Sequence, residues 1–246
     1  MKLIELEEVD STNDYLKREY QNLPMQTCVT AKYQTKGRGR NGHVWESHAN
    51  ENLIMSFLFK DFHKIEDAWK MTQLATCSVV GLLDRYRIKA TIKWPNDIVL
   101  NRKKVCGILT EMNMEIDSIA YVVVGVGINV NRMEFREDIA ETATSLKKES
   151  GHSIERAELL SEILSAFFRD YKLFLEKQDL SPFLESYNQK LVNVGREVKI
   201  IKKGEEIIRT AIGINDRGEL IVQDAEGNTE HIFSGEVSVR GIYGYV

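Results

Sequence analysis

Residues 52–59, NLIMSFLF, are apolar at nearly every position, and this run constrains the fold more than any other stretch of the chain. A strand with one face in water alternates apolar and polar side chains, whereas a strand covered on both faces does not. The run therefore predicts a β-strand inside a layered structure. Residues 27–34, TCVTAKYQ, predict a second strand, so the segment that joins the two is a loop framed by strands.

The remainder of the first 190 or so residues mixes helical and strand patterns. Apolar residues recur at helical spacing over 65–86 and again over 157–175, and DSTND at 10–14 supplies capping residues for an earlier helix. Further strands are predicted at 3–7, on both sides of the turn Pro95-Asn96-Asp97, and in a long apolar hairpin that turns around Glu115 to Ser118.

From Val192 onward, short Val/Ile-rich runs are separated by KKGE, NDRGE, AEGN and SGE. This cadence is typical of a small all-β barrel. We therefore predict an α+β protein with two domains. Residues 1–191 form a large domain with a mixed β-sheet and helices, and residues 192–246 form a small β-barrel domain.

Composition and charge exclude several classes of protein. The chain has 246 residues, 43% of them hydrophobic, and a formal charge of −4, which argues against a general nucleic-acid or membrane-surface binder. The N-terminus has no apolar leader-like run, and Cys28, Cys77 and Cys106 form neither a CxxC pair nor a zinc-like spacing with histidine. The sequence predicts a cytoplasmic protein with reduced thiols and with neither a nucleic-acid nor a membrane partner.

The loop KGRGRNG, residues 36–42, carries three positive charges and three glycines. Glycines let backbone N–H groups approach an oxyanion, and the guanidinium groups of Arg38 and Arg40 match phosphate or carboxylate geometry. The pattern favours an anionic ligand. A solvated basic loop is an equally good interpretation of this stretch alone, because it matches neither the Walker pattern nor a clean GxGxxG.

Two further stretches carry residues that are suited to binding or catalysis. Lys93, in IKWPND, is presented from a strand end beside a rigid proline, where a fixed ammonium group is a useful electrostatic catalyst. The alternative is an ordinary surface lysine. GVGIN places Gly125 and Gly127 at a period of two on a strand and ends in Asn129. This pattern indicates close approach of a flat ligand or of another backbone, or else a β-bulge.

These stretches occur in the order DSTND, YQTKGRGRNGHVW, NLIMSF, KWPNDIVLNRKKVCGILTE and VVGVGINVN. In this order they resemble the signature of the biotin protein ligases over essentially the whole chain. The resemblance implies a catalytic domain similar to class II synthetases followed by an SH3-like barrel. It also implies formation of biotinyl-5′-adenylate from biotin and MgATP, and transfer of biotin to a lysine of a biotin carboxyl carrier protein or domain. Homodimer formation is left open.

The resemblance also assigns residues. Lys93 would bridge the biotin carboxylate and the α-phosphate, Arg40 would hold the phosphate, and Arg38 with Gly37 would close over the ligand. The positions that match the biotin side are Ser11, Thr12, Asn13, Gln34, Gly37, Arg38, Lys93, Gly107, Gly125 and Gly127. The positions that match the nucleotide side are Arg38, Arg40, Trp45, Lys93 and Asn129. Glu111 and Asp97 are acidic and close to these motifs, but the sequence assigns neither as a Mg²⁺ ligand.

The chain departs from the family pattern in two places. Asn41 and His43 stand where members often carry arginine, which makes the loop less basic. The sequence also begins almost at DSTND, so we expect neither a winged-helix segment nor operator binding.

Two other functions compete with this interpretation. A lipoate or octanoate ligase or transferase of the same fold would carry an apolar acyl group and leave Ser11, Thr12 and Gln34 unpaired. A non-catalytic RNA-binding module would use the glycine-arginine loop and nearby aromatic residues, but the acidic total charge argues against it.

Overall fold

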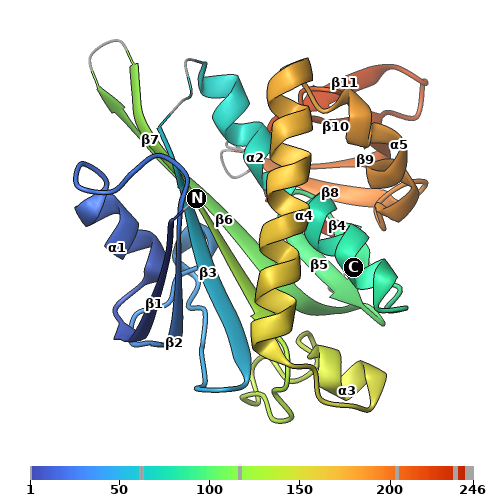
Figure 1. The fold of residues 1–246 in the computed structure, drawn as a ribbon. Coiled ribbons are helices and arrows are strands. Elements are labelled where there is room, and N and C mark those ends of the chain that lie inside the picture. The colour runs from blue at the N-terminus through green and yellow to red at the C-terminus, as the bar shows by residue number, and fades with distance from the viewer. Residues whose placement is uncertain are drawn as a thin grey trace.

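The computed structural model describes residues 2–60, 62, 64–115, 118–202, 205–234 and 238–241 (Figure 1). A seven-stranded mixed sheet runs through the large domain in the order β1-β2-β3-β7-β6-β5-β4. β1 and β2 are parallel, and the other neighbours are antiparallel. The strands are β1 (Lys2–Val9), β2 (Thr27–Gln34), β3 (Asn52–Phe59), β4 (Thr91–Lys93), β5 (Asp97–Leu100), β6 (Lys103–Glu115) and β7 (Ser118–Asn129).

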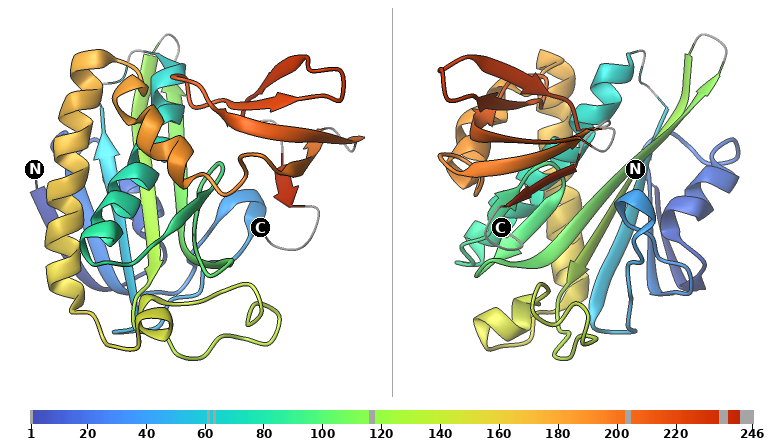
Figure 2. Two further views of the ribbon diagram at one scale, coloured as in Figure 1. Left: turned by 90° about the vertical axis from the view of Figure 1, so that its right-hand side faces the viewer. Right: turned by 180° about the vertical axis from the view of Figure 1, so that it is seen from behind.

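β3 is buried at all eight positions, as the unbroken apolar run predicts. On one face of the sheet, α1 (Thr12–Glu19) packs Leu16 against Leu58 of β3 and Val123 of β7. On the other face lie α2 (Ile65–Arg85) and α4 (Arg156–Lys177), which also pack against each other (Figures 1 and 2). The central strands are covered on both faces because the helices form a layer on each side.

Local capping and turn signals place the shorter elements. The Ser11 side chain caps α1 by accepting the backbone N–H of Asp14 at 3.4 Å, as the DSTND motif predicts. The turn after β4 is shorter than expected, because Asp97 already belongs to β5 and pairs with Lys93 across the strands. The predicted hairpin is present, with β6 ending at Glu115 and β7 beginning at Ser118.

A second, fully antiparallel sheet follows the short helices α3 (Leu146–Ser150) and α5 (Leu184–Lys190). Its order is β11-β10-β9-β8-β12, from β8 (Glu197–Lys202), β9 (Glu205–Ile214), β10 (Leu220–Gln223), β11 (Thr229–Ile232) and β12 (Ser238–Gly241). The structure thus confirms the α+β class, with a mixed-sheet domain followed by a small β domain.

The small domain lies against the large one rather than apart from it (Figure 2). Trp94 Nε1 donates to the Gly218 carbonyl at 3.1 Å, and the backbone N–H of Val192 donates to the Ile92 carbonyl at 2.8 Å. Side chains of both sheets join one hydrophobic cluster. The division at residues 191 and 192 stays a prediction.

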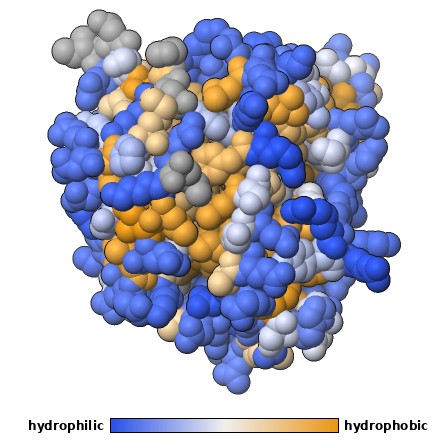
Figure 3. All heavy atoms as spheres, viewed as in Figure 1, coloured by the Kyte–Doolittle hydropathy of each residue, from blue (hydrophilic) through white to orange (hydrophobic). Residues whose placement is uncertain are grey.

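In the space-filling view, apolar residues gather at the centre of one face and hydrophilic residues surround them (Figure 3). Among the described residues, no helix is both long and apolar enough to cross a membrane.

The three cysteines are expected to be unreactive in the folded protein. Cys28 and Cys106 have no exposed surface, and burial raises the pKa of every thiol, that of Cys77 to about 12. Because the thiolate is the reactive form, iodoacetamide at about pH 8 should leave the native protein essentially unlabelled. Mass spectrometry of native and urea-unfolded samples would check this, and fast labelling of the native protein would contradict it.

Candidate active site

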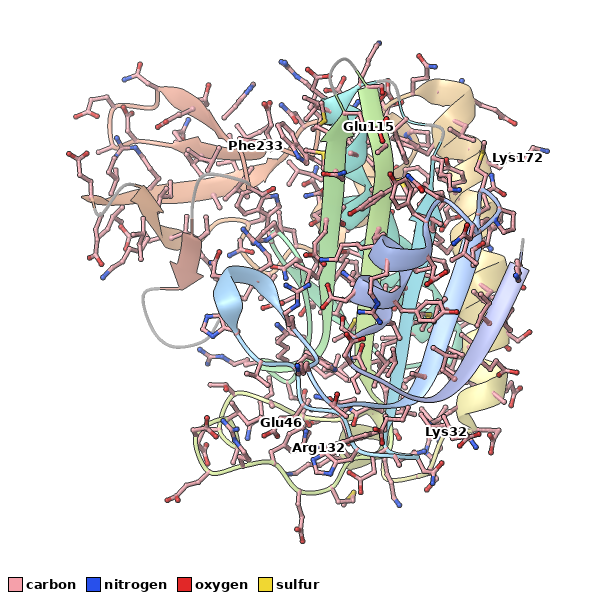
Figure 4. The ribbon with its side chains drawn as sticks, turned by 90° about the vertical axis from the view of Figure 1, so that its left-hand side faces the viewer. Lys32, Glu46, Glu115, Arg132, Lys172 and Phe233 are labelled. Carbon is pink, nitrogen blue, oxygen red and sulfur yellow. The ribbon has the colours of Figure 1, made fainter. Side chains whose placement is uncertain are left out.

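A cavity of about 450 Å³, mouth included, lies where the start of α1, the end of β2 and the middle of β6 and β7 meet. The loop between β2 and β3 covers it, and Figure 4 shows this loop in light blue beside the central strands. Ten of the residues that the sequence singled out line this one cavity. They are Ser11, Thr12, Asn13, Gln34, Arg38, Arg40, Trp45, Gly107, Gly125 and Gly127.

The polar end of the cavity is a cluster of buried side chains in close contact. The backbone N–H of Thr12 donates to Gln34 Oε1 at 2.8 Å, and Thr12 Oγ1 lies 3.0 Å from the same oxygen. Ser56 Oγ lies 2.7 Å from Thr12 Oγ1 and 2.6 Å from Asn13 Oδ1. The helix start and two strands thus meet at one polar cluster.

This cluster has fewer protons than contacts. Gln34 Oε1 accepts the Thr12 amide, and Asn13 Nδ2 donates to Glu111 Oε2 at 2.8 Å, so both side chains present oxygen to the hydroxyl groups. The hydroxyls of Thr12 and Ser56 supply one proton each for the three oxygen–oxygen contacts. One contact therefore has no proton of its own, and the oxygens of the cluster keep free lone pairs that can accept an N–H donor from a ligand.

The mouth of the cavity beside α1 holds a group of alternating charges. Arg38 contacts Asp14 Oδ1 at 2.5 Å and Glu111 Oε1 at 3.4 Å, and Lys17 reaches the same two carboxylates at 2.8 Å. Burial alone would lower the pKa of Lys17, but its hydrogen bonds to Asp14 and Glu111 outweigh burial and raise it. Arg38 is thus held at the cavity wall by carboxylates of α1 and β6.

The loop folds back on itself as a narrow antiparallel pair. The Gly39 N–H donates to the His43 carbonyl at 2.7 Å, and the Trp45 N–H donates to the Gly37 carbonyl at 3.0 Å. A Cβ at position 37 would lie 2.3 Å from the Trp45 carbonyl oxygen, so only glycine permits this approach. Gly37 therefore shapes the loop, although it does not line the cavity itself.

Arg40 ties the tip of the loop to two distant elements. One guanidinium nitrogen donates to Asn96 Oδ1 at 3.1 Å in the turn between β4 and β5, and another donates to the Ser234 carbonyl at 2.8 Å in the small domain. Burial lowers the pKa of Arg40, and nearby Asp97 opposes the shift. An arginine keeps its charge under such conditions, so a fixed cation stands at this end of the cavity.

Trp45 lies over glycines that have no side chain to obstruct it. A Cβ at Gly127 would lie 2.5 Å from the Trp45 ring, and one at Gly107 would lie 3.1 Å from it. Trp45 Nε1 is buried and has no hydrogen-bond partner among the described residues. Packing and the backbone therefore hold the ring in place, not a hydrogen bond.

Comparison with known proteins identifies the family. A model of the biotin/lipoate A/B protein ligase family matches residues 5–129, and a model of the biotin protein ligase C-terminal domain matches residues 194–240. The bifunctional ligase/repressor BirA of Bacillus spizizenii is 34% identical over 89% of this chain and 67% of its own length. The chain belongs to the biotin protein ligases. It is therefore an ATP-dependent enzyme that ligates biotin.

Solved structures and other relatives agree with this assignment. The biotin protein ligase from Aquifex aeolicus in complex with biotin and ATP is similar to this ligase with a TM-score of 0.84 and 34% identity, over 98% of this chain and 99% of that one. The biotin--[acetyl-CoA-carboxylase] ligase of Mycobacterium tuberculosis is 28% identical over 85% of this chain and 77% of its own length. Both the family and the fold class predicted from the sequence are confirmed.

The ligase places Lys104, which the sequence interpretation missed, in the cavity wall. Its Nζ lies 2.6 Å from Asp97 Oδ1 and 5.7 Å from the centre of a Trp45 ring. Lys93 is buried at the end of β4 and does not line this cavity. The sequence contains one indication of this role, because Lys104 stands three residues before Gly107, a predicted cavity glycine.

Asn129 makes its hydrogen bonds within the protein, and its assignment to the nucleotide side stays a prediction. Its Oδ1 accepts from Asn52 at 2.8 Å and its Nδ2 donates to the Thr144 carbonyl at 3.0 Å, and it does not line the cavity. The ligase uses this amide to join β3, β7 and the segment before α3.

Among the described residues, no group of three or more histidine, cysteine, aspartate or glutamate side chains is arranged to hold a metal ion. Asp97 contacts Lys104, and Glu111 contacts Lys17 and Asn13. Mg²⁺ in nucleotide sites commonly binds through substrate phosphates with one or two carboxylates rather than in a protein cage. The site is compatible with that mode, and neither carboxylate is assigned as a ligand.

Proposed function

We propose that this cavity joins the carboxylate of biotin to the α-phosphate of ATP and then passes the biotinyl group to a lysine amine of a carrier protein. The observation that carries the proposal is the polarity of the cavity. Its inner end holds an excess of hydrogen-bond acceptors, its other end holds the cations Lys104 and Arg40, and glycines separate the two. Biotin has the same order of groups, with a ureido ring at one end and a carboxylate at the other.

The inner end suits the ureido ring because this ring carries two N–H donors. These donors face a wall in which Ser11, Thr12, Asn13 and Gln34 present oxygen acceptors. Ser56 does not line the cavity, but its hydroxyl holds Thr12 and Asn13 in place. A dithiolane or a plain acyl chain has no N–H donor and would cover these polar acceptors without adding a hydrogen bond, which is costly. This argument favours biotin over lipoate and octanoate.

The charged end suits the bond-forming step. A biotin carboxylate oxygen attacks the α-phosphorus, the bond from that phosphorus to the bridging oxygen breaks, and pyrophosphate leaves with the electron pair. Lys104 and Arg40 stabilise the negative charge that gathers on the phosphoryl oxygens, and they hold two anions close together. Mg²⁺ bound to the nucleotide would neutralise further charge.

The second step uses the mixed anhydride that the first step forms. A lysine amine of the carrier attacks the biotinyl carbonyl carbon, loses a proton and becomes an amide, while AMP leaves with the electrons of the cleaved acyl–oxygen bond. The loop limits hydrolysis in the interval by covering the anhydride.

Trp45 is the aromatic surface that we assign to adenine. Its ring occupies the space over Gly127 and Gly107, so a ligand that runs along these glycines has to displace or stack on it. The amide of Asn129 is occupied by Asn52 and the Thr144 carbonyl, so we assign it a structural role beside the cavity.

The family implies biotin carboxyl carrier proteins as the second substrate. We propose the carrier domain of a biotin-dependent carboxylase in the cytoplasm as the partner. A wider hollow between the loop, Trp69 of α2 and Phe233 of the small domain adjoins the cavity at Arg38 and Arg40. It gives the carrier lysine a route to the anhydride.

We expect biotin to support ATP–pyrophosphate exchange, and lipoate and octanoate to support at least about 100-fold less, because buried acceptors reject analogues that lack the donor. The assay uses the purified full chain with each acid in parallel. Equal exchange with lipoate would contradict the assignment of Ser11, Thr12 and Gln34 to a ureido ring while leaving the adenylation mechanism in place.

A further inference from the structure

Arg132 is a buried charge outside the cavity. It follows β7, and only 4% of its side chain is exposed. A guanidinium nitrogen lies 2.8 Å from Glu46 Oε2, Nε donates to the Glu134 carbonyl at 2.7 Å, and the guanidinium carbon lies 4.7 Å from the centre of the Phe135 ring. Figure 4 shows Glu46 and Arg132 near each other at one end of the sheet. Nothing in the proposed chemistry uses this arginine.

Burying the charge of Arg132 costs free energy, so the ion pair needs an explanation other than stability. Removing a guanidinium from water is expensive, and a buried pair often adds little net stability compared with apolar residues of similar size. Such a buried ion pair also fixes the two segments that carry its members in one relative position. Here the segments are the loop that carries Glu46 and the chain that leaves β7.

Glu46 directly follows Trp45 in the loop, so the backbone conformation at Glu46 affects the orientation of the indole ring. The two neighbours of Glu46 are held by hydrogen bonds to the end of β2 and the loop after it. The Trp45 N–H donates to the Gly37 carbonyl, and Ser47 Oγ exchanges hydrogen bonds with the Gln34 backbone at 2.9 and 3.1 Å. The Glu46 carboxylate reaches away from them to Arg132. Rotation of the backbone at Glu46 would therefore turn Trp45.

The segment after β7, which carries Arg132, is held firmly by hydrogen bonds. The backbone N–H of Asn131 donates to the Glu51 carbonyl at 2.8 Å, and its side chain exchanges hydrogen bonds with the Ile154 backbone at 2.9 and 3.0 Å. Arg132 therefore projects from a segment that the fold holds on two sides.

We infer that the Glu46–Arg132 ion pair is a positioning device for Trp45, which fixes the indole ring over the glycines for the nucleotide. The indole N–H makes no hydrogen bond with the described residues, so the ring depends on packing and on the loop backbone for its orientation. Arg132 is a positioning residue and touches neither substrate. The inference rests on the proposed role of Trp45 at adenine.

The test is Arg132→Met, assayed as pyrophosphate exchange with ATP and biotin varied separately. We expect the KM for ATP to rise about tenfold and the KM for biotin to change less than about twofold, because the biotin end lies on α1, β2 and β3. Arg132→Lys keeps the charge and should restore part of the ATP affinity.

Arg136→Ala is the matched control. Arg136 contacts the same carboxylate, Glu46 Oε1, at 2.9 Å, but 57% of its side chain is exposed, so its loss should leave both KM values unchanged. A rise in both KM values for Arg132→Met, or in neither, would overturn the inference. Circular dichroism spectra of each variant show whether the fold is retained.

Trp45→Ala separates this inference from the proposed function. If Trp45→Ala raises the KM for ATP and Arg132→Met does not, the positioning device is wrong while the adenine site stands. If Trp45→Ala leaves the KM for ATP unchanged, the assignment of Trp45 fails and the inference fails with it.

Discussion

Lys104→Met is expected to slow biotin-dependent ATP–pyrophosphate exchange by about 100- to 1,000-fold, the usual effect of removing one group that stabilises transition-state charge. Lys104 lines the cavity, contacts Asp97 and lies beside Gly107, where the carboxylate end of biotin would lie. Methionine keeps most of the length and loses the charge. Single-turnover measurement of adenylate formation, with saturating biotin and ATP, isolates the chemical step from binding.

Two further lysine variants show whether the effect is specific to Lys104. Lys103→Met is the control, because Lys103 Nζ donates to the Ala140 carbonyl and its residue does not line the cavity. Lys93→Met tests the assignment that the sequence motif favours. A greater loss with Lys93→Met than with Lys104→Met, in variants with unchanged unfolding temperatures, would contradict the assignment to Lys104.

The choice between the two lysines shows where sequence reasoning reaches its limit. Both belong to one motif, and only strand register decides which of them lies near the ligand. Gly107 on β6 pairs with Gly127 on β7, so Lys104 lies on a strand that forms the cavity floor. Lys93 lies on β4, the edge strand two positions farther along the sheet. Register is a long-range property, which the local pattern around each lysine does not contain.

Local sequence patterns predicted the features that depend on neighbouring residues. The unbroken apolar run at 52–59 forms a strand buried on both faces, and Ser11 caps the helix that it precedes. The alternation of glycines in GVGIN predicted a place of close approach, and there the Asn13 side chain lies against Gly125 and the Trp45 ring against Gly127. These features follow from hydrophobic period, capping and glycine geometry within about ten residues.

The pair Glu46–Arg132 could not be predicted in that way. The two residues lie 86 positions apart, and each looks like an ordinary surface charge in its own segment. Their contact arises only when β3 and β7 pair and bring the loop before one strand beside the chain after the other. The same pairing uses Asn129, which the sequence assigned to the nucleotide, to join Asn52 to Thr144.

Arg40→Gly is expected to shorten the half-life of the bound biotinyl adenylate by roughly 10- to 100-fold, since a hydrogen bond from a charged group contributes about 1.5–3 kcal/mol. Arg40 holds the loop tip to Asn96 and to the Ser234 carbonyl, and we propose that it also holds the phosphate. Without it the tip loses both attachments, and the loop opens more often. Release is measured by loading the enzyme with radiolabelled biotin and ATP, adding excess unlabelled biotin and following the bound label.

Glycine also adds backbone freedom, so Arg40→Met is needed to identify the cause. If the guanidinium closes the loop, the two variants should release adenylate at similar rates, and His43→Ala, at an exposed position near the loop tip, should behave as the unmodified protein does. Fast release from the glycine variant alone would assign the effect to backbone freedom. An unchanged half-life in both variants would mean that other contacts keep the loop closed, and the carboxylates that hold Arg38 at 2.5 and 3.4 Å would then be the next to replace.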